Sequence, residues 1–167
     1  TSHYDNCGVC DIDLSNNCVP DCAGVWGGIS IDDCNGVCNG DAVVLWGTCY
    51  ATDITLLDLE NRGLTGSIPT EIGNLINLTH LYLQSNQLTG DIPPEIGNLT
   101  NLTYLGLSNN QLTGEIPPEI GNLTIDLLVH LDYLSLSNNQ LTGEIPVEIC
   151  QLIYLSYLNL SNNQLCP

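Results

Sequence analysis

Nine cysteines offer the most reactive side chains in this 167-residue chain, and six of them fall within the first 42 residues. Closely spaced thiols either form disulfides or, as thiolates, bind zinc. The absence of a Cys/His set with fixed zinc-site spacing favours disulfides. The predicted disulfide cysteines are Cys7, Cys10, Cys18, Cys22, Cys34, Cys38, Cys49, Cys150 and Cys166. We expect Cys49 to bond back into the cysteine-rich segment. Cys150 and Cys166 could bridge each other; alternatively, Cys166 bonds the amino-terminal module of a following subunit.

A short acidic stretch in the same segment places oxygen ligands on alternate residues, as calcium loops do. Asp11, Asp13 and Asn17 would be the ligands. A full calcium loop also needs a glycine near its sixth position and a bidentate acid at its end, and both are missing. A solvated acidic turn is therefore the preferred interpretation, with calcium as the alternative and no other cofactor indicated.

A histidine and four tyrosines recur at related positions along the rest of the chain: His80, Tyr82, Tyr104, Tyr133 and Tyr157. An aromatic row of this kind could bind a protein, a glycan or another subunit, or it could be ordinary cross-strand stacking. Neither His80 nor His130 has a catalytic partner at a suitable spacing, and the sequence has no phosphate-binding loop. We therefore expect that the protein is not an enzyme.

Five Asn-x-Ser/Thr sequons could carry N-glycans in a secreted protein: Asn77, Asn98, Asn101, Asn122 and Asn159. Asn98 and Asn122 fall on expected turns and are the favoured acceptors.

The elements that position these residues come from a repeat. LYLQSNQL at residues 81–88 returns as LGLSNNQL, LSLSNNQL and LNLSNNQL, usually after 24 residues. Leucines at alternate positions predict a short strand with one buried face, which a single coil cannot cover alone, so coils must stack. Asn86, Asn110, Asn139 and Asn163 should pair buried loop backbone where each strand ends. Arg62 holds this position in the first copy and cannot do the same.

Between the strands runs LTGEIPPEIGNL or a close variant, in which L-T-G-x-I-P resembles the plant-type subfamily of leucine-rich repeats. The resemblance covers residues 54–167 and implies an α/β solenoid of about five right-handed coils. It also implies a parallel β-sheet on the concave face, a second short strand at T-G-x-I-P, and 3₁₀ or helical turns on the convex side. Residues 43–53, with Trp46 and Cys49, resemble the cap of such repeats. Residues 1–42 resemble a disulfide-stapled Cys/Asp/Gly-rich extracellular module.

Charge narrows the classes of partner. The chain has 19 acidic residues against one Lys or Arg, giving a net charge of −18. Nucleic acid is excluded because nothing here could neutralise phosphates. No apolar run approaches the ~20 residues of a membrane span. The secreted type of repeat leads us to expect an extracellular or cell-surface location.

The carboxyl-terminal coil leads to our main hypothesis of function. Its leucines have no following coil in this sequence: Leu155, Leu158, Leu160 and Leu165. We expect them to form an assembly surface that docks head-to-tail on the next copy and builds a fibre or surface appendage. The alternative is a receptor- or adhesin-like module that binds protein or glycan on its concave face. Ice binding is a third idea, which the acidic edge disfavours. An apolar insertion at residues 125–129 could add packing or contact a partner.

Overall fold

The computed structural model describes residues 3–4, 10–11, 42–123 and 130–166 of a chain that divides into two compact units, Thr1–Ala42 and Val43–Pro167. In the first unit, β1 (His3–Tyr4) pairs antiparallel with β2 (Cys10–Asp11). The other five cysteines predicted there (Cys7, Cys18, Cys22, Cys34 and Cys38) and the insertion at residues 125–129 lie outside the described residues. Their pairing and packing stay predictions.

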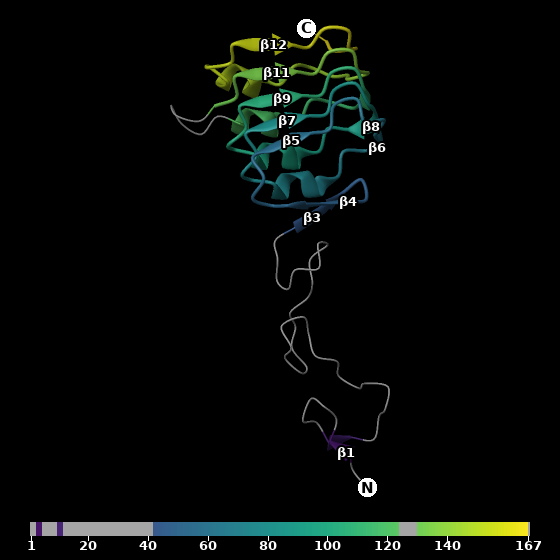
Figure 1. Ribbon diagram of the computed structural model, residues 1–167. Coiled ribbons are helices and arrows are strands. Elements are labelled where there is room, and N and C mark those ends of the chain that lie inside the picture. The colour runs from purple at the N-terminus through teal and green to yellow at the C-terminus, as the bar shows by residue number, and fades with distance from the viewer. Residues whose placement is uncertain (1–2, 5–9, 12–41, 124–129, 167) are drawn as a thin grey trace. The chain divides into compact units, whose positions relative to one another are not determined.

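The second unit is a solenoid built on one five-stranded parallel sheet, with strand order β12-β11-β9-β7-β5. Figure 1 shows these strands stacked one above another in chain order. The register repeats coil by coil, so that Leu57, Leu81, Leu105, Leu134 and Leu158 are successive partners. The predicted solenoid with a parallel sheet is confirmed. The strands are β5 (Leu56–Asp58), β7 (His80–Tyr82), β9 (Tyr104–Gly106), β11 (Tyr133–Ser135) and β12 (Tyr157–Asn159).

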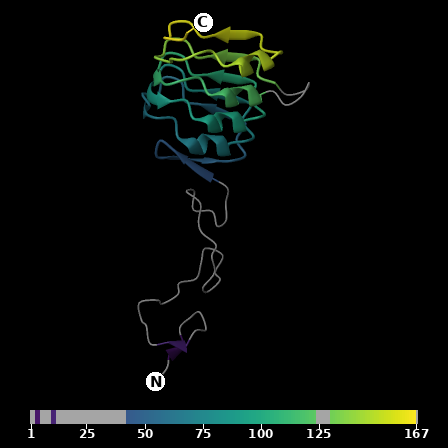
Figure 2. The same ribbon diagram turned by 180° about the vertical axis from the view of Figure 1, so that it is seen from behind.

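A second parallel sheet forms the lateral face of the solenoid, from β6 (Thr65–Gly66), β8 (Gln87–Asp91) and β10 (Gln111–Thr113). Single bridges Glu115–Thr142 and Glu144–Cys166 continue it. The remaining side carries 3₁₀ turns, which Figure 2 shows stacked beside one another: η2 (Thr70–Asn74), η3 (Pro94–Asn98), η4 (Pro118–Leu123) and η5 (Val147–Gln151). A proline in extended conformation precedes η2, η3 and η5, because its fixed φ suits the entry to a helical turn.

Leucines and isoleucines from every coil meet in one continuous core, in which most are fully buried. Burial falls away at the last coil. Leu155, Leu160 and Leu165 are half-buried against the core, whereas Leu158 is 45 % exposed. Ile153 and Val147 in the same coil are 72 % and 74 % exposed. The physical reason is that each inner coil is covered on both sides and this one on one side.

The predicted asparagine ladder pairs backbone groups at the end of each strand. The amide nitrogen of Asn110 donates to the carbonyl oxygens of Leu83 (2.9 Å) and Leu107 (3.1 Å), and its Oδ1 accepts from the Leu88 N–H (3.1 Å). Asn86, Asn139 and Asn163 make equivalent bonds. Arg62 makes no such ladder; its backbone N–H instead donates to Asn86 Oδ1 at 3.0 Å. The ladder satisfies polar groups that stacking removes from water.

A second asparagine ladder, which sequence reasoning missed, runs along the exposed edge next to the first. Asn109, Asn138 and Asn162 adopt positive φ of 55–56°, a conformation that asparagine tolerates better than most residues. Asn138 donates to Asn109 Oδ1 (3.0 Å), and Asn162 donates to Asn138 Oδ1 (2.6 Å).

Glycine in the E-I-G-N-L turn is required by the coil that follows. A Cβ on Gly73 would lie 2.6 Å from the Glu95 carbonyl oxygen, and one on Gly121 would lie 2.7 Å from the Glu148 Cβ. Gly97 has the same conflict with the Glu119 carbonyl oxygen. At the fourth turn this position is Cys150, which is exposed. A regular coil stacked on this turn would therefore collide with the Cys150 side chain.

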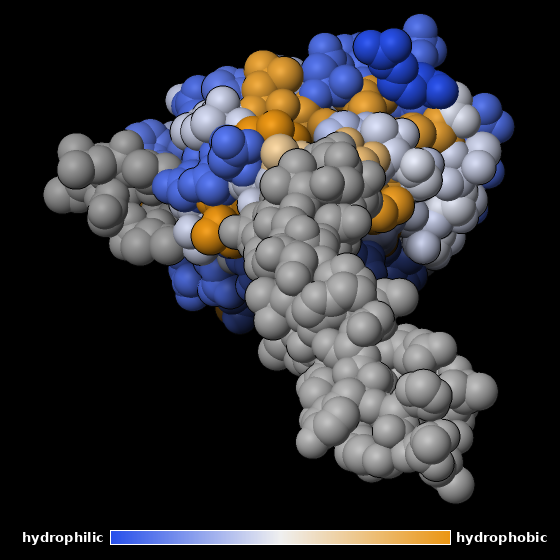
Figure 3. Space-filling model, turned by 60° about the horizontal axis from the view of Figure 1, so that its bottom comes forward, coloured by the Kyte–Doolittle hydropathy of each residue, from blue (hydrophilic) through white to orange (hydrophobic). Residues whose placement is uncertain are grey.

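The amino-terminal end of the solenoid is covered by the hairpin of β3 (Ala42–Leu45) and β4 (Thr48–Ala51). Val43 and Leu45 are buried in the core, and Trp46 packs against it while its Nε1 donates to the Ser67 carbonyl oxygen at 3.1 Å. Cys49 is disulfide-bonded. Figure 3 shows apolar patches among hydrophilic residues at this end, where Val44 is 50 % exposed.

Candidate functional site: the concave aromatic face

The concave sheet places the predicted aromatic residues in one line across the coils. Strand pairing puts His80, Tyr104, Tyr133 and Tyr157 in direct register, and we call these four residues the aromatic column. Tyr82 lies beside the column, two residues after His80 on the same strand. The structure thus brings all five predicted concave-face residues together on one surface.

The rings of the column stack face to face. Tyr104 and Tyr133 have ring centroids 4.1 Å apart and an interplanar angle of 5°, and Tyr133 and Tyr157 are 4.4 Å apart at 5°. Tyr82 approaches the free side of Tyr104 at 4.4 Å with a tilt of 37°, and His80 lies 6.2 Å from Tyr104. Such stacking contributes to stability beyond apolar burial. Tyr157 at the end of the column is 42 % exposed.

Hydroxyl groups of the column make one hydrogen bond within the column, between Tyr104 and Tyr133, and one to the next row. Burial raises the pKa of the Tyr104 phenol well above its usual range, and its hydrogen bond with Tyr133 and the nearby negative charge of Glu60 act in the same direction. Asn159 donates to the Tyr157 hydroxyl at 3.2 Å. The Tyr104 phenol is therefore neutral at physiological pH.

Two carboxylates at the first-coil end complete the face: Asp58 in β5 and Glu60, two residues after the end of that strand. Neither residue was among those predicted for the site from the sequence. Leu56 stands in register with His80 and is 54 % exposed. Asp58 and Glu60 follow it on the same face, both exposed. Glu60 Oε2 accepts a 2.8 Å hydrogen bond from Gln84 Nε2, and Asp58 Oδ1 accepts from the Glu60 N–H at 3.1 Å. The 24-residue spacing from Tyr82 and Gln84 already predicts that Asp58 and Glu60 occupy outward positions of the first coil, but it does not single them out as site residues. Leu56 has the same spacing from His80.

The sequons divide into two structural groups. Asn98 and Asn122 are exposed at the ends of η3 and η4, as expected for accessible acceptors. Asn77 and Asn101 donate to the carbonyl oxygens of Thr52 (3.1 Å) and Ile76 (2.9 Å) in the preceding coil. Asn159 belongs to the concave sheet, where its Oδ1 accepts from the backbone N–H and the hydroxyl of Ser161.

The predicted bridge between Cys150 and Cys166 is not formed. Both thiols are free and exposed. Cys150 lies in η5, whereas Cys166 bridges Glu144 on the lateral face, so the two cysteines are on different sides of the coil. Of the proposed calcium ligands, Asp13 and Asn17 lie outside the described residues, and Asp11 lies in β2. Among the described residues, no three His, Cys, Asp or Glu side chains cluster as metal ligands.

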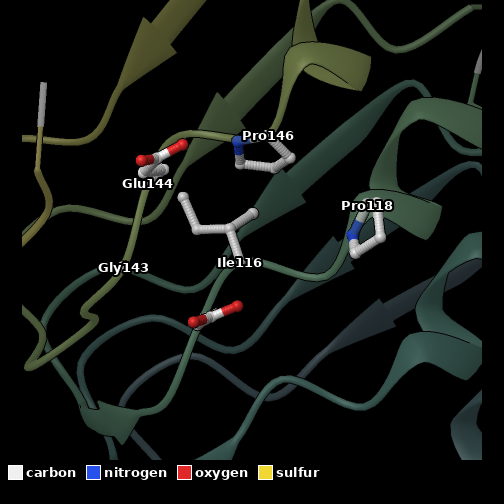
Figure 4. Close-up of a pocket in the computed structure, with 6 residues that line it drawn as sticks. Ile116, Pro118, Gly143, Glu144 and Pro146 are labelled. Atoms are coloured by element: carbon white, nitrogen blue, oxygen red, sulfur yellow. The ribbon is translucent and has the colours of Figure 1, made fainter.

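A shallow groove of about 440 Å³ opens on the lateral face between two coils. Glu144 and Pro146 come from one coil, whereas Ile116 and Pro118 come from the coil before it. Figure 4 shows Ile116 between Pro118 and the pair Glu144 and Pro146. None of the predicted site residues lines this groove. In the described part of the chain, no helix is long and apolar enough to cross a bilayer.

Comparison with known proteins identifies the repeats. A family model described as "Leucine Rich repeats (2 copies)" matches residues 76–118, and one described as "Leucine Rich Repeat" matches residues 53–75 and 130–152. Together they match just over half of the chain. No curated protein matches the chain.

Solved structures similar to the chain include leucine-rich repeat ectodomains of plant receptor kinases. The ectodomain of the Arabidopsis thaliana receptor kinase GASSHO1/SCHENGEN3, in complex with CASPARIAN STRIP INTEGRITY FACTOR 2, is 41 % identical with a TM-score of 0.64. That match covers 68 % of this chain and 13 % of the receptor chain. The Arabidopsis thaliana BIR2 ectodomain is 39 % identical with a TM-score of 0.61, covering 66 % of this chain and 56 % of that one.

A plant ice-binding protein is 37 % identical with a TM-score of 0.58, covering 67 % of this chain and 35 % of that protein. The chain spans less than two thirds of each of these relatives. The repeat matches, the stacked parallel sheet and the asparagine ladder agree with one another, and we conclude that this chain belongs to the leucine-rich repeat proteins.

Proposed function

We propose that this protein is a non-catalytic, extracellular recognition module that binds a protein or peptide partner on its concave face. The single observation that carries the proposal is the aromatic column: four aromatic side chains in register, flanked by Tyr82, on one face of a rigid sheet. Tyrosine supplies a large contact area at low conformational cost and is enriched where proteins bind one another.

The similar structures support this proposal over assembly into a fibre. Among them are the plant peptide hormone receptor RGFR1 in complex with RGF2, and the receptor kinase HAESA in complex with the peptide hormone IDA and the co-receptor SERK1. The similarity to ectodomains of receptor kinases and the disulfide at Cys49 support an extracellular setting. The same similarity to plant ectodomains supports the plant-type L-T-G-x-I-P assignment. In such a setting Asn98 and Asn122 are the proposed N-glycan acceptors.

A peptide library displayed on phage tests the proposal. Peptides are selected for binding to the full chain. Their binding is then measured on two variants, Tyr133→Asp on the concave face and Gln111→Asp on the lateral face. Both variants add one acidic group, and a thermal melt checks that each is folded. We expect the selected peptides to lose binding to the concave variant and to keep it on the lateral one. Equal binding to both variants would refute concave-face recognition.

Head-to-tail association stays a second hypothesis, because the last coil exposes Val147, Ile153 and Leu158. Sedimentation velocity over a range of concentrations tests association. Large species that disappear in Leu158→Asp would support it, and a concentration-independent monomer would refute it.

A further inference from the structure

We propose that the ligand of the concave face is a basic, extended polypeptide segment rather than a sugar, an inference that rests on the proposed function. The sequence leaves both protein and glycan open as ligand classes. The orientation of the rings and the charges beside them favour protein.

The faces of the inner rings are already covered by neighbouring rings. Tyr133 is sandwiched between Tyr104 and Tyr157 with both interplanar angles at 5°. Tyr104 has Tyr133 on one side and Tyr82 on the other. Stacking of a pyranose ring requires a free aromatic face, and these inner rings do not offer one. A ligand meets ring edges, which carry partial positive charge, and phenol hydroxyls, which donate and accept hydrogen bonds.

Beside the two inner tyrosines the sheet carries small residues. Gly106 and Ser135 are register partners in the row next to the column, and both are buried. The Gln84 side chain and the Tyr104 ring lie against Gly106, so the inner tyrosines close over this part of the sheet. The carbonyl groups of an extended chain lying along the column would face ring edges and hydroxyls. A peptide backbone satisfies this surface better than a sugar ring does.

Negative charge lies at one end of the face. Asp58 and Glu60 are exposed at the first-coil end of the face, and Gln84 holds the Glu60 carboxylate in place at 2.8 Å. The chain has a net charge of −18, and Arg62 is its single Lys or Arg. A partner with lysine or arginine near this end would be attracted and oriented, whereas an acidic one would be repelled. The exposed Leu56 adds an apolar contact at the same end.

The test must separate this site from the general attraction of an acidic protein for cations. Two charge-neutralising pairs serve as matched variants: Asp58→Asn with Glu60→Gln on the concave face, and Asp91→Asn with Glu115→Gln on the lateral face. Each removes two exposed carboxylates at nearly constant volume. The probes are a dodecapeptide of alternating lysine and serine, its glutamate counterpart, and a neutral N-acetylglucosamine hexasaccharide. Binding to the full chain is measured by calorimetry at ~0.15 M salt, where long-range attraction is screened.

We expect the lysine peptide alone to bind. The concave double variant should weaken binding of the lysine peptide about five- to tenfold, because two exposed ion pairs are lost. The lateral double variant should weaken it less than about twofold. Equal weakening by both pairs, or no binding of the lysine peptide to the unmodified protein, would overturn the proposal. So would hexasaccharide binding that Tyr133→Ala abolishes. Selected library peptides that need Tyr133 but lack basic residues would overturn this inference and leave the proposed function standing.

Discussion

Replacing Asn110 by alanine tests whether the inner asparagine ladder stabilises the solenoid as its geometry indicates. The Asn110 side chain makes three close hydrogen bonds to backbone and is 9 % exposed. Not all three losses weigh equally. The carbonyl oxygens of Leu83 and Leu107 each keep a second donor, from Asn86 and Asn139. The buried Leu88 N–H loses its Oδ1 acceptor.

An orphaned buried backbone donor costs about 1–3 kcal/mol, and each carbonyl that keeps one partner loses less. We therefore expect Asn110→Ala to lower the free energy of unfolding by about 2–4 kcal/mol, and the midpoint of thermal unfolding by roughly 4–16 °C, since each kcal/mol shifts it about 2–4 °C at this size. Asn163→Ala is the matched control. Asn163 has the same bonding pattern in the last coil, but it is only half-buried, so water can replace its bonds.

Equilibrium urea unfolding followed by circular dichroism, alongside thermal melts, measures both variants. The control should lose about 1 kcal/mol or less. A loss below about 1 kcal/mol for Asn110→Ala, or equal losses at the two positions, would show that burial of the ladder does not set its contribution.

Three further predictions follow from other parts of the molecule. Gly97→Ala should destabilise by about 1–3 kcal/mol because its Cβ would press on the Glu119 backbone, whereas Cys150→Ala should change stability by less than ~0.5 kcal/mol; similar unfolding midpoints for the two would contradict the packing account. Because the folded pKa of Tyr104 is raised above its unfolded value of about 10, the stability linked to that proton is complete below pH ~10 and declines as pH rises towards the folded value. Titration by ultraviolet absorbance should show a late-ionising phenol that Tyr104→Phe removes, and an unchanged titration would be evidence against its burial. If Asp11, Asp13 and Asn17 bind calcium, a chelator should lower the melting temperature of the first unit, and identical melting curves would exclude the site.

Several features of the fold could be predicted because they depend on local pattern. Leucines at alternate positions define which side of each strand is buried, and a constant repeat length puts those sides in line. The same regularity predicted the role of Asn86, Asn110, Asn139 and Asn163, because each stands at a fixed distance from a buried strand. It also predicted that His80, Tyr104, Tyr133 and Tyr157 share one row.

What the sequence could not decide is how side chains on adjacent coils meet, because those contacts join residues about 24 positions apart. Ring orientation is one example: the spacing of the tyrosines does not tell whether their faces are open to a ligand or covered by one another. The Gln84–Glu60 bond and the outer ladder of Asn109, Asn138 and Asn162 are others.

The cysteines show the same division. Sequence established that Cys150 replaces a glycine, but only the packing of Gly73, Gly97 and Gly121 against the following coil shows why that substitution matters. A Cβ costs nothing in an isolated turn and a great deal when backbone from the next coil occupies its place. Periodicity along the chain therefore determined the solenoid, whereas close contact between its coils decided which of its surfaces can bind.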